Sequence, residues 1–147
     1  MNIESSFWII SLSLLFSSFF SGMEIAFVAS NKLHIELMKK RGENNARIIS
    51  YFLESPSRFI ATMLVGNNIA LVVYGIEMAK TLEPCITLYI TNIDSVILLL
   101  QTIISTIIVL VTAEFLPKVL FSFNANRFVR IFAIPASISY YFLFPIV

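Results

Sequence analysis

Three long apolar stretches, separated by more polar segments, dominate the pattern along this chain of 147 residues. They run approximately over residues 7–28, 59–79 and 95–116. An α-helix rises about 1.5 Å per residue, and roughly 20 residues are needed to cross the hydrocarbon core of a bilayer. Each stretch is therefore long enough for one crossing, and the pattern predicts an all-α membrane protein with three transmembrane helices.

Composition supports this class. Hydrophobic residues make up 58% of the chain and charged residues 13%, which is more apolar than an ordinary soluble domain. Residues 1–6 contain no Lys or Arg and the first apolar run is longer than a typical h-region, so we interpret it as a retained helix and not as a signal peptide. The net charge of +1 gives no reason to expect a nucleic acid partner. The lone Cys85 excludes an internal disulfide and a cysteine-based metal cluster.

Basic residues orient the predicted helices. Six Lys or Arg residues lie in segment 30–58, whereas segment 80–94 has only Lys80. The positive-inside rule then places 30–58 in the cytoplasm and the N-terminus outside. Three more basic residues follow the third stretch, which places the C-terminus in the cytoplasm. We expect an integral protein of a bacterial inner (plasma) membrane.

The remaining segments predict helices at the membrane surface. Apolar residues recur at helical spacing in 31–55 with an interruption at Gly42, which predicts two cytoplasmic amphipathic helices. Ser55 is expected to cap the next helix, which begins at Pro56. Residues 124–147 are expected to form a juxtamembrane, interfacial belt helix. A fourth crossing by residues 131–147 is the alternative, and it would move the C-terminus outside.

Polar residues interrupt the first apolar stretch. Ser17, Ser21 and Glu24 follow one another at helical spacing and form a stripe, with Gly22 in its middle. Such residues are costly inside a membrane and indicate a site for something polar. The alternative is ordinary helix packing, in which Gly22 permits close approach; a local irregularity at Gly22 would instead free backbone carbonyl oxygens.

The second stretch contains Gly66, Asn67 and Asn68 near its middle. Each carboxamide needs hydrogen-bond partners or a cation at that depth. Adjacent helical positions differ by about 100° in direction, so one Asn is expected to ligate while the other braces the site. A hydrogen bond between helices of a dimer is the alternative.

The third stretch ends with Glu114 and Pro117-Lys118. Proline removes the usual helical donor to the carbonyl of Ala113, so we expect the helix to kink or end there. An ion pair between Glu114 and Lys118 is the alternative role for the carboxylate. Together the three stretches offer hydroxyl, carboxamide, carboxylate and backbone oxygens, while His34 lies outside them. Oxygen ligands of this kind suit magnesium or calcium better than zinc or copper.

These residues resemble the motifs of the CNNM/CorC family of magnesium transporters. Phe19 to Ala26 is similar to the first-helix motif, Gly66-Asn67-Asn68 to the second and Glu114 to Lys118 to the third. The resemblance implies three transmembrane helices, cytoplasmic juxtamembrane helices, a belt helix, a homodimer in membrane lipid, and magnesium export that is proposed to be sodium-coupled. It implies a set of metal ligands comprising Ser17, Ser21, Gly22, Asn67, Asn68 and Glu114. Structural or gating roles are expected for Glu24, Gly66, Pro117 and Lys118.

The chain departs from the family pattern in two features. Ala113 stands where many relatives have Gly before the Glu. Relatives also continue into a cytosolic CBS-type module, which this chain does not contain, so we expect a truncated chain or an excised membrane domain. The alternative function is a membrane anchor and dimerisation scaffold for such a module or for a partner protein. We expect no enzyme, because Ser21, Glu24 and His34 come without an evident oxyanion site.

Overall fold

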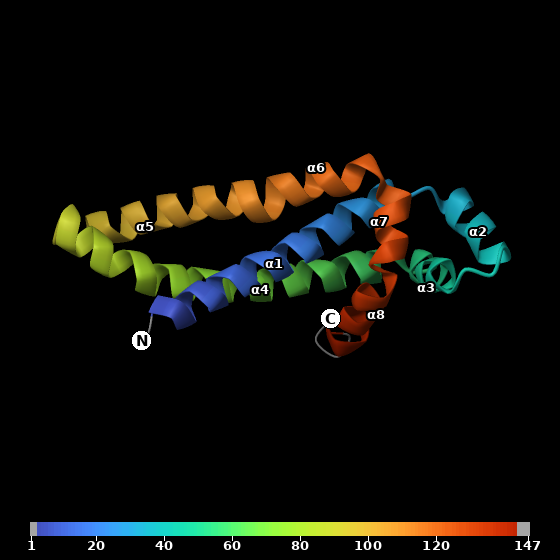
Figure 1. Ribbon diagram of the computed structural model, residues 1–147, viewed down its shortest axis with the longest axis horizontal. Coiled ribbons are helices and arrows are strands. Elements are labelled where there is room, and N and C mark those ends of the chain that lie inside the picture. Colours follow the sequence, from blue (N-terminus) through green and yellow to red (C-terminus); the bar gives the residue numbers. More distant parts are fainter. Residues whose placement is uncertain (1–2, 144–147) are drawn as a thin grey trace.

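The computed structural model describes residues 3–143, and within that part of the chain every regular element is a helix (Figure 1). Three long apolar helical runs, Glu4–Ala29, Pro56–Tyr89 and Asp94–Phe123, are each long enough to cross a membrane. The predicted all-α membrane protein is thereby confirmed. The elements in chain order are α1 (Ile3–Ala29), α2 (Lys32–Lys40), α3 (Asn44–Leu53), α4 (Pro56–Tyr89), α5 (Asp94–Val109), η1 (Leu110–Phe115), α6 (Leu116–Phe123), α7 (Ala125–Ile131) and α8 (Ala133–Leu143).

Helices α1 and α4 form the principal packed pair, and α6 lies along the other side of α1 (Figure 1). The core between them contains Phe20, Met23, Phe59 and Met63, all buried. Aromatic contacts extend this core toward α3, because the ring of Phe59 contacts that of Phe52 with centroids 4.8 Å apart. Burial of these large side chains against one another fixes the pair more firmly than any polar contact of the fold.

Helix α4 is longer than the apolar stretch that predicts it. It covers 34 residues, so the predicted connection of residues 80–94 is largely a continuation of the helix, and only Ile90–Ile93 separates it from α5. Good helix formers after position 79, including Lys80, Leu82 and Glu83, carry the helix past the apolar run. The helix accommodates Pro84 in its interior.

Two short helices fill the connection between α1 and α4. They are separated at Gly42, whose φ of 90° lies in the left-handed region that glycine adopts readily. Asn31 caps α2, since its Oδ1 accepts hydrogen bonds from the backbone N–H groups of Leu33 and His34. Ser55 occupies the N-cap position of α4 but makes no side-chain capping hydrogen bond, so the start of α4 depends on Pro56.

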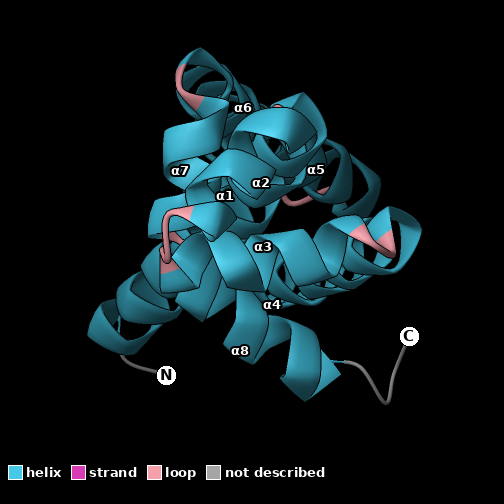
Figure 2. Cartoon of the chain, turned by 90° about the vertical axis from the view of Figure 1, so that its right-hand side faces the viewer, coloured by secondary structure: helices cyan, strands magenta, loops and turns pink. Residues whose placement is uncertain are grey.

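Helices α7 and α8 run across the bundle and not along it (Figures 1 and 2). Helix α8 packs against α3 and α4 and contains 11 residues, which rise only about 16 Å. The described part of α8 is shorter than a crossing of roughly 30 Å, and the interfacial belt stays a prediction for this segment. The last part of the predicted belt, residues 144–147 with Pro145, lies outside the described residues.

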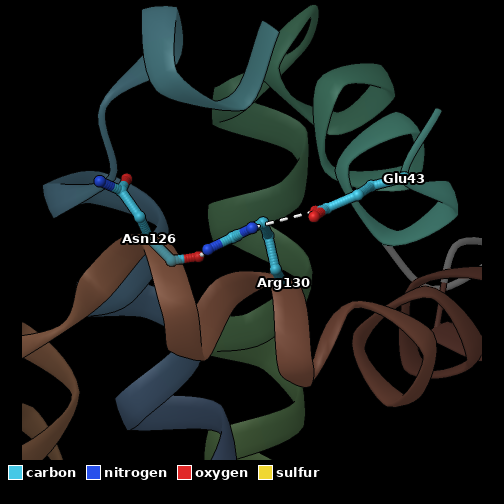
Figure 3. Close-up of polar contacts among 3 residues, drawn as sticks. All are labelled: Glu43, Asn126 and Arg130. Atoms are coloured by element: carbon cyan, nitrogen blue, oxygen red, sulfur yellow. Dashed lines mark hydrogen bonds and ion pairs between the residues drawn. The ribbon is translucent and has the colours of Figure 1, made fainter. Parts of the chain in front are cut away.

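A polar junction ties these crossing helices to the connection before α4 (Figure 3). Arg130 of α7 donates from Nη1 to Glu43 Oε2 at 2.9 Å and from Nε to the Asn126 carbonyl at 3.2 Å. The backbone N–H of Asn31 donates to Asn126 Oδ1 at 2.6 Å. The junction therefore connects three turns that are distant in sequence.

Candidate ion site between the long helices

A buried hydrogen bond joins α1 to α4 at the predicted polar stripe. Ser17 Oγ donates to Asn67 Oδ1 at 2.5 Å, and the two residues are 0% and 6% exposed. Ser13 and Ser21 lie one turn to either side of Ser17 on α1 and are also buried. Helical spacing puts these three hydroxyl groups on one face. The contact between α1 and α4 is therefore lined by oxygen atoms over two helical turns.

The next turn of α1 after Ser21 shares a pocket with Glu114. One turn beyond Ser21 is Ile25, which lines a pocket of about 550 Å³ together with Glu114 and Lys118. Glu114 is half-buried and makes no hydrogen bond or ion pair with the described residues. Glu114 and Lys118 thus face a common pocket without forming the ion pair considered as the alternative role for Glu114.

Pro117 changes the helix in a different way from the one predicted. The helix does not end there; it widens into the π-helical turn η1 and continues as α6. The N–H of Leu116 donates to the Val111 carbonyl, five residues back. In this register the next carbonyl, that of Thr112, would need an N–H at position 117, where proline has none. The Thr112 carbonyl is therefore left without a helical donor in this register, and the loss of the donor to the Ala113 carbonyl stays a prediction.

A hydroxyl of α1 compensates for the missing donor. Ser18 Oγ donates to the Thr112 carbonyl at 3.2 Å. Ser17 and Ser18 are adjacent, so at this level α1 bonds to α4 through one serine and to η1 through the next. The sequence analysis did not select Ser18 or Thr112 as site residues. The only sequence signal for them is that a second hydroxyl follows Ser17 directly.

The two glycines of the motifs accommodate aromatic rings. A Cβ added at Gly66 would meet the ring of Phe20 at 2.7 Å, and one added at Gly22 would meet the ring of Phe121 at 2.8 Å. Helix α1 is a regular α-helix through Gly22, so the irregularity that would free carbonyl oxygens there is not found. Close approach is the role that the structure gives to both glycines.

The two asparagines differ in environment. Asn67 is buried in the contact with Ser17, whereas Asn68 is exposed and makes no hydrogen bond with the described residues. Their different directions follow from the 100° step between adjacent helical positions. Glu24 is half-buried, one turn beyond Ser21. The described residues thus bring Ser17 and Asn67 into direct contact and leave Asn68 and Glu114 open to a ligand.

The donor set is almost free of charge. No group of three or more His, Cys, Asp or Glu side chains gathers anywhere in residues 3–143. At the contact between α1, α4 and η1, the predicted ligands are neutral oxygen donors together with the carboxylate of Glu114. Hard cations such as magnesium accept such oxygens, whereas zinc and copper prefer His or Cys.

Comparison with known proteins places the chain in a family. The pattern of the cyclin M (CNNM) transmembrane N-terminal domain matches residues 8–147. The chain is also 30% identical over 102 residues to the UPF0053 inner membrane protein YfjD of Escherichia coli K12. That alignment covers 69% of this chain and 22% of the relative, so the chain spans about a fifth of that protein's length. This chain, an integral membrane protein with three membrane-length helices, belongs to the CNNM transmembrane domain family.

Proposed function

We propose that this domain transports magnesium across the membrane, from the cytoplasm outward. The family is associated with metal ion transport, and the observation that carries the proposal is the oxygen-lined contact between α1 and α4. A Ser–Asn hydrogen bond buried to this degree lies where apolar side chains would otherwise pack. Polar groups at membrane depth mark ion pathways more often than they serve packing alone.

The proposed path uses the residues in order along the stripe. Magnesium gives up its water reluctantly, so the carboxylate of Glu114 and the carboxamide of Asn68, both still accessible, are suited to receive it first. Ser17, Ser21 and Asn67 would then replace part of the hydration shell. For Ser17 and Asn67 to do so, their mutual hydrogen bond must open. Exchange of that bond for bonds to the ion is the step that links binding to helix movement.

The widened turn η1 is a suitable place for such movement. π-Helical turns occur frequently at functional sites, and many transporters build ion sites at breaks in membrane helices. Glu114 lies within η1, so a return of this turn to α-helical register would rotate the carboxylate relative to α1. We propose a homodimer as the working unit and a sodium gradient as the driving force, with a cytosolic module of the longer relatives as regulator.

The ligand assignment is tested by magnesium-dependent thermal stabilisation of the purified protein. We expect magnesium to raise the unfolding temperature of the wild type, and Asn68→Ala and Glu114→Gln to lose most of that rise. Matched controls are Asn92→Ala and Glu83→Gln, which change exposed residues near the turn between α4 and α5 and should retain it. Full retention in both site variants would overturn the assignment.

Transport itself is tested in proteoliposomes. Magnesium flux should depend on Glu114 and should rise when sodium is more concentrated on the side toward which magnesium moves. Flux that is unaffected by Glu114→Gln would contradict the proposed path. Flux that is independent of the sodium gradient would remove sodium coupling alone.

A second function is favoured by the glycine contacts. Gly22 and Gly66 each receive a phenylalanine ring, and the Ser17–Asn67 bond satisfies both partners within the chain. These features also suit a membrane anchor and dimerisation scaffold. In that case Ser17→Ala and Asn68→Ala would weaken helix association or crosslinked dimers and leave magnesium binding, measured by calorimetry, unchanged.

A further inference from the structure

A second pair of polar residues lies between α4 and α5, away from the proposed magnesium path. Glu77 of α4 is 7% exposed, and its Oε2 atom has no hydrogen-bond partner. Gln101 of α5 likewise has a buried Oε1 atom without a partner. These are the two buried side-chain oxygens of the described residues that lack one. Buried polar atoms without partners are rare in folded proteins and call for an explanation.

The two residues lie at the same level of the helix pair. Tyr74 donates its hydroxyl hydrogen to the Ser105 carbonyl at 2.8 Å, which fixes how α4 and α5 are aligned. Glu77 lies three residues after Tyr74 on α4, and Gln101 lies four residues before Ser105 on α5. Both are therefore closer than the bond to the turn that connects the two helices, by about 4.5 and 6 Å. Residues three or four positions apart lie on the same face of a helix, so Glu77 and Gln101 lie on the faces that carry the bond between Tyr74 and Ser105. Helical spacing thus directs the carboxylate of Glu77 and the amide of Gln101 toward the same seam between α4 and α5.

The charges around this seam are few. Lys80 Nζ lies 3.6 Å from Glu77 Oε1, on the other side of the carboxylate from the unpartnered atom, and its side chain is 52% exposed. Glu4 of α1 and Asp94 of α5 are exposed. The hydroxyl of Tyr74 is already used by Ser105. No donor from the described part of either helix reaches the two free oxygens.

We infer that Glu77 and Gln101 form a binding site for a monovalent metal cation. Two acceptor oxygens in a dry seam attract a positive charge, and both are hard donors of the kind that alkali and alkaline-earth cations accept. The seam holds one carboxylate, whose other oxygen lies 3.6 Å from Lys80 Nζ, so it offers at most a single negative charge and suits a monovalent ion better than a divalent one. The site is independent of the magnesium assignment, since it shares no residue with it.

The test is thermal unfolding of the purified chain in chelator, without magnesium. N-methyl-D-glucamine chloride is replaced by sodium or potassium chloride at constant ionic strength. At saturation we expect at least one of the two metal cations to raise the unfolding temperature by roughly 5 °C in the wild type. Glu77→Gln, which keeps the shape and removes the charge, should lose the rise. Gln101→Met should reduce it, and Glu83→Gln, an exposed position of the same helix, should keep it.

Each alternative gives a distinct result. A water molecule bridging the two oxygens, or an amide hydrogen bond from Gln101 to the carboxylate, would satisfy the seam without a cation, so the wild type would show no cation-dependent rise. That outcome, or an equal rise in Glu77→Gln, overturns the inference. If Glu77→Gln fails to fold, the wild type and Gln101→Met still decide the question. Magnesium stabilisation measured in Gln101→Met and Glu114→Gln separates this site from the proposed path, because only the second variant should lose it.

Discussion

The first two long helices and the third differ in how much of them the protein itself covers. In their most apolar windows, 39% of the residues are buried in both α1 and α4, whereas 11% are buried in the run from α5 to α6. The first pair contains the buried serines, the asparagine and the glycines that receive aromatic rings. The third run holds the π-helical turn and the accessible Glu114. A closely packed pair thus stands beside a more weakly attached helix.

This difference in burial indicates different roles for the α1–α4 pair and for the run from α5 to α6. Cores at native packing density have few alternative arrangements, so the pair formed by α1 and α4 is suited to be the fixed frame of the domain. The third run has a smaller buried share, and we expect its π-helical turn to be the place where its register changes. The comparison predicts that substitutions in the pair act mainly on stability, and that substitutions in the third run act mainly on movement.

Gly66→Ala should break the fixed pair and have the largest effect on stability. The added methyl group would meet the Phe20 ring at 2.7 Å, and overpacking of this kind costs about 2 kcal/mol in free energy of unfolding. Gly75→Ala is the matched control on the same helix, because a Cβ there meets nothing within 4 Å and alanine favours the helix. Equal stabilities of the two variants, measured by denaturant titration in micelles, would refute the close packing of α1 and α4.

The Ser17–Asn67 bond should contribute a smaller, measurable coupling. A double-mutant cycle with Ser17→Ala and Asn67→Ala is expected to give about 1 kcal/mol between the two sites, the size found for hydrogen bonds between membrane helices. Ser139→Ala with Asn67→Ala is the control cycle, since Ser139 donates within α8. A coupling near zero for Ser17 and Asn67 would show that the bond does not hold the pair together.

Pro117→Ala should make the third run more regular and thereby sharpen the contrast. The new N–H can pair with a carbonyl of η1, so we expect a stabilisation of about 1 kcal/mol, the net contribution of one hydrogen bond, together with slower amide exchange at 110–116 and slower magnesium flux. Pro84→Ala removes another proline from a helix interior and should leave both exchange at 110–116 and flux unchanged. Unaltered exchange in Pro117→Ala would show that the proline does not maintain the turn.

The junction between Arg130 of α7 and Glu43 before α3 lies outside both regions, and its loss should have the smallest effect. The side chains are 23% and 45% exposed, and ion pairs with such exposure contribute about 0.5 kcal/mol. Arg130→Gln and Glu43→Gln should therefore shift the unfolding free energy slightly and non-additively, and high salt should reduce the shift. A loss of several kcal/mol would mean that the junction, and not the core, holds α7 against α3.

The sequence predicts much of the fold, because its strongest signals are local. Apolar runs of about 20 residues locate the three long helices, and Gly42 marks the break between α2 and α3. The end of α4 is not predicted, since helix-forming residues after position 79 extend the helix independently of hydropathy. The break at Phe132 that divides the predicted belt into α7 and α8 is followed by Pro135, whose missing N–H falls in the first turn of α8.

The candidate site is harder to predict from local sequence signals than the fold is. Ser17, Asn67 and Glu114 stand out as polar residues in apolar runs, but which asparagine turns inward depends on the rotation of α4, and that is set by packing. The π-helical turn is the clearest case. Pro117 signals that a carbonyl loses its donor, yet the compensating donor to Thr112 is Ser18, 94 residues away. Contacts between distant segments decide what local rules leave open.

The length of α4 has a consequence for the surrounding lipid. Its 34 residues rise about 51 Å, whereas the hydrocarbon layer is about 30 Å thick. The surplus is taken up by tilt or by protrusion of the helix ends. Since α1 is packed along α4, we expect a thinner or thicker bilayer to change the tilt of both helices together.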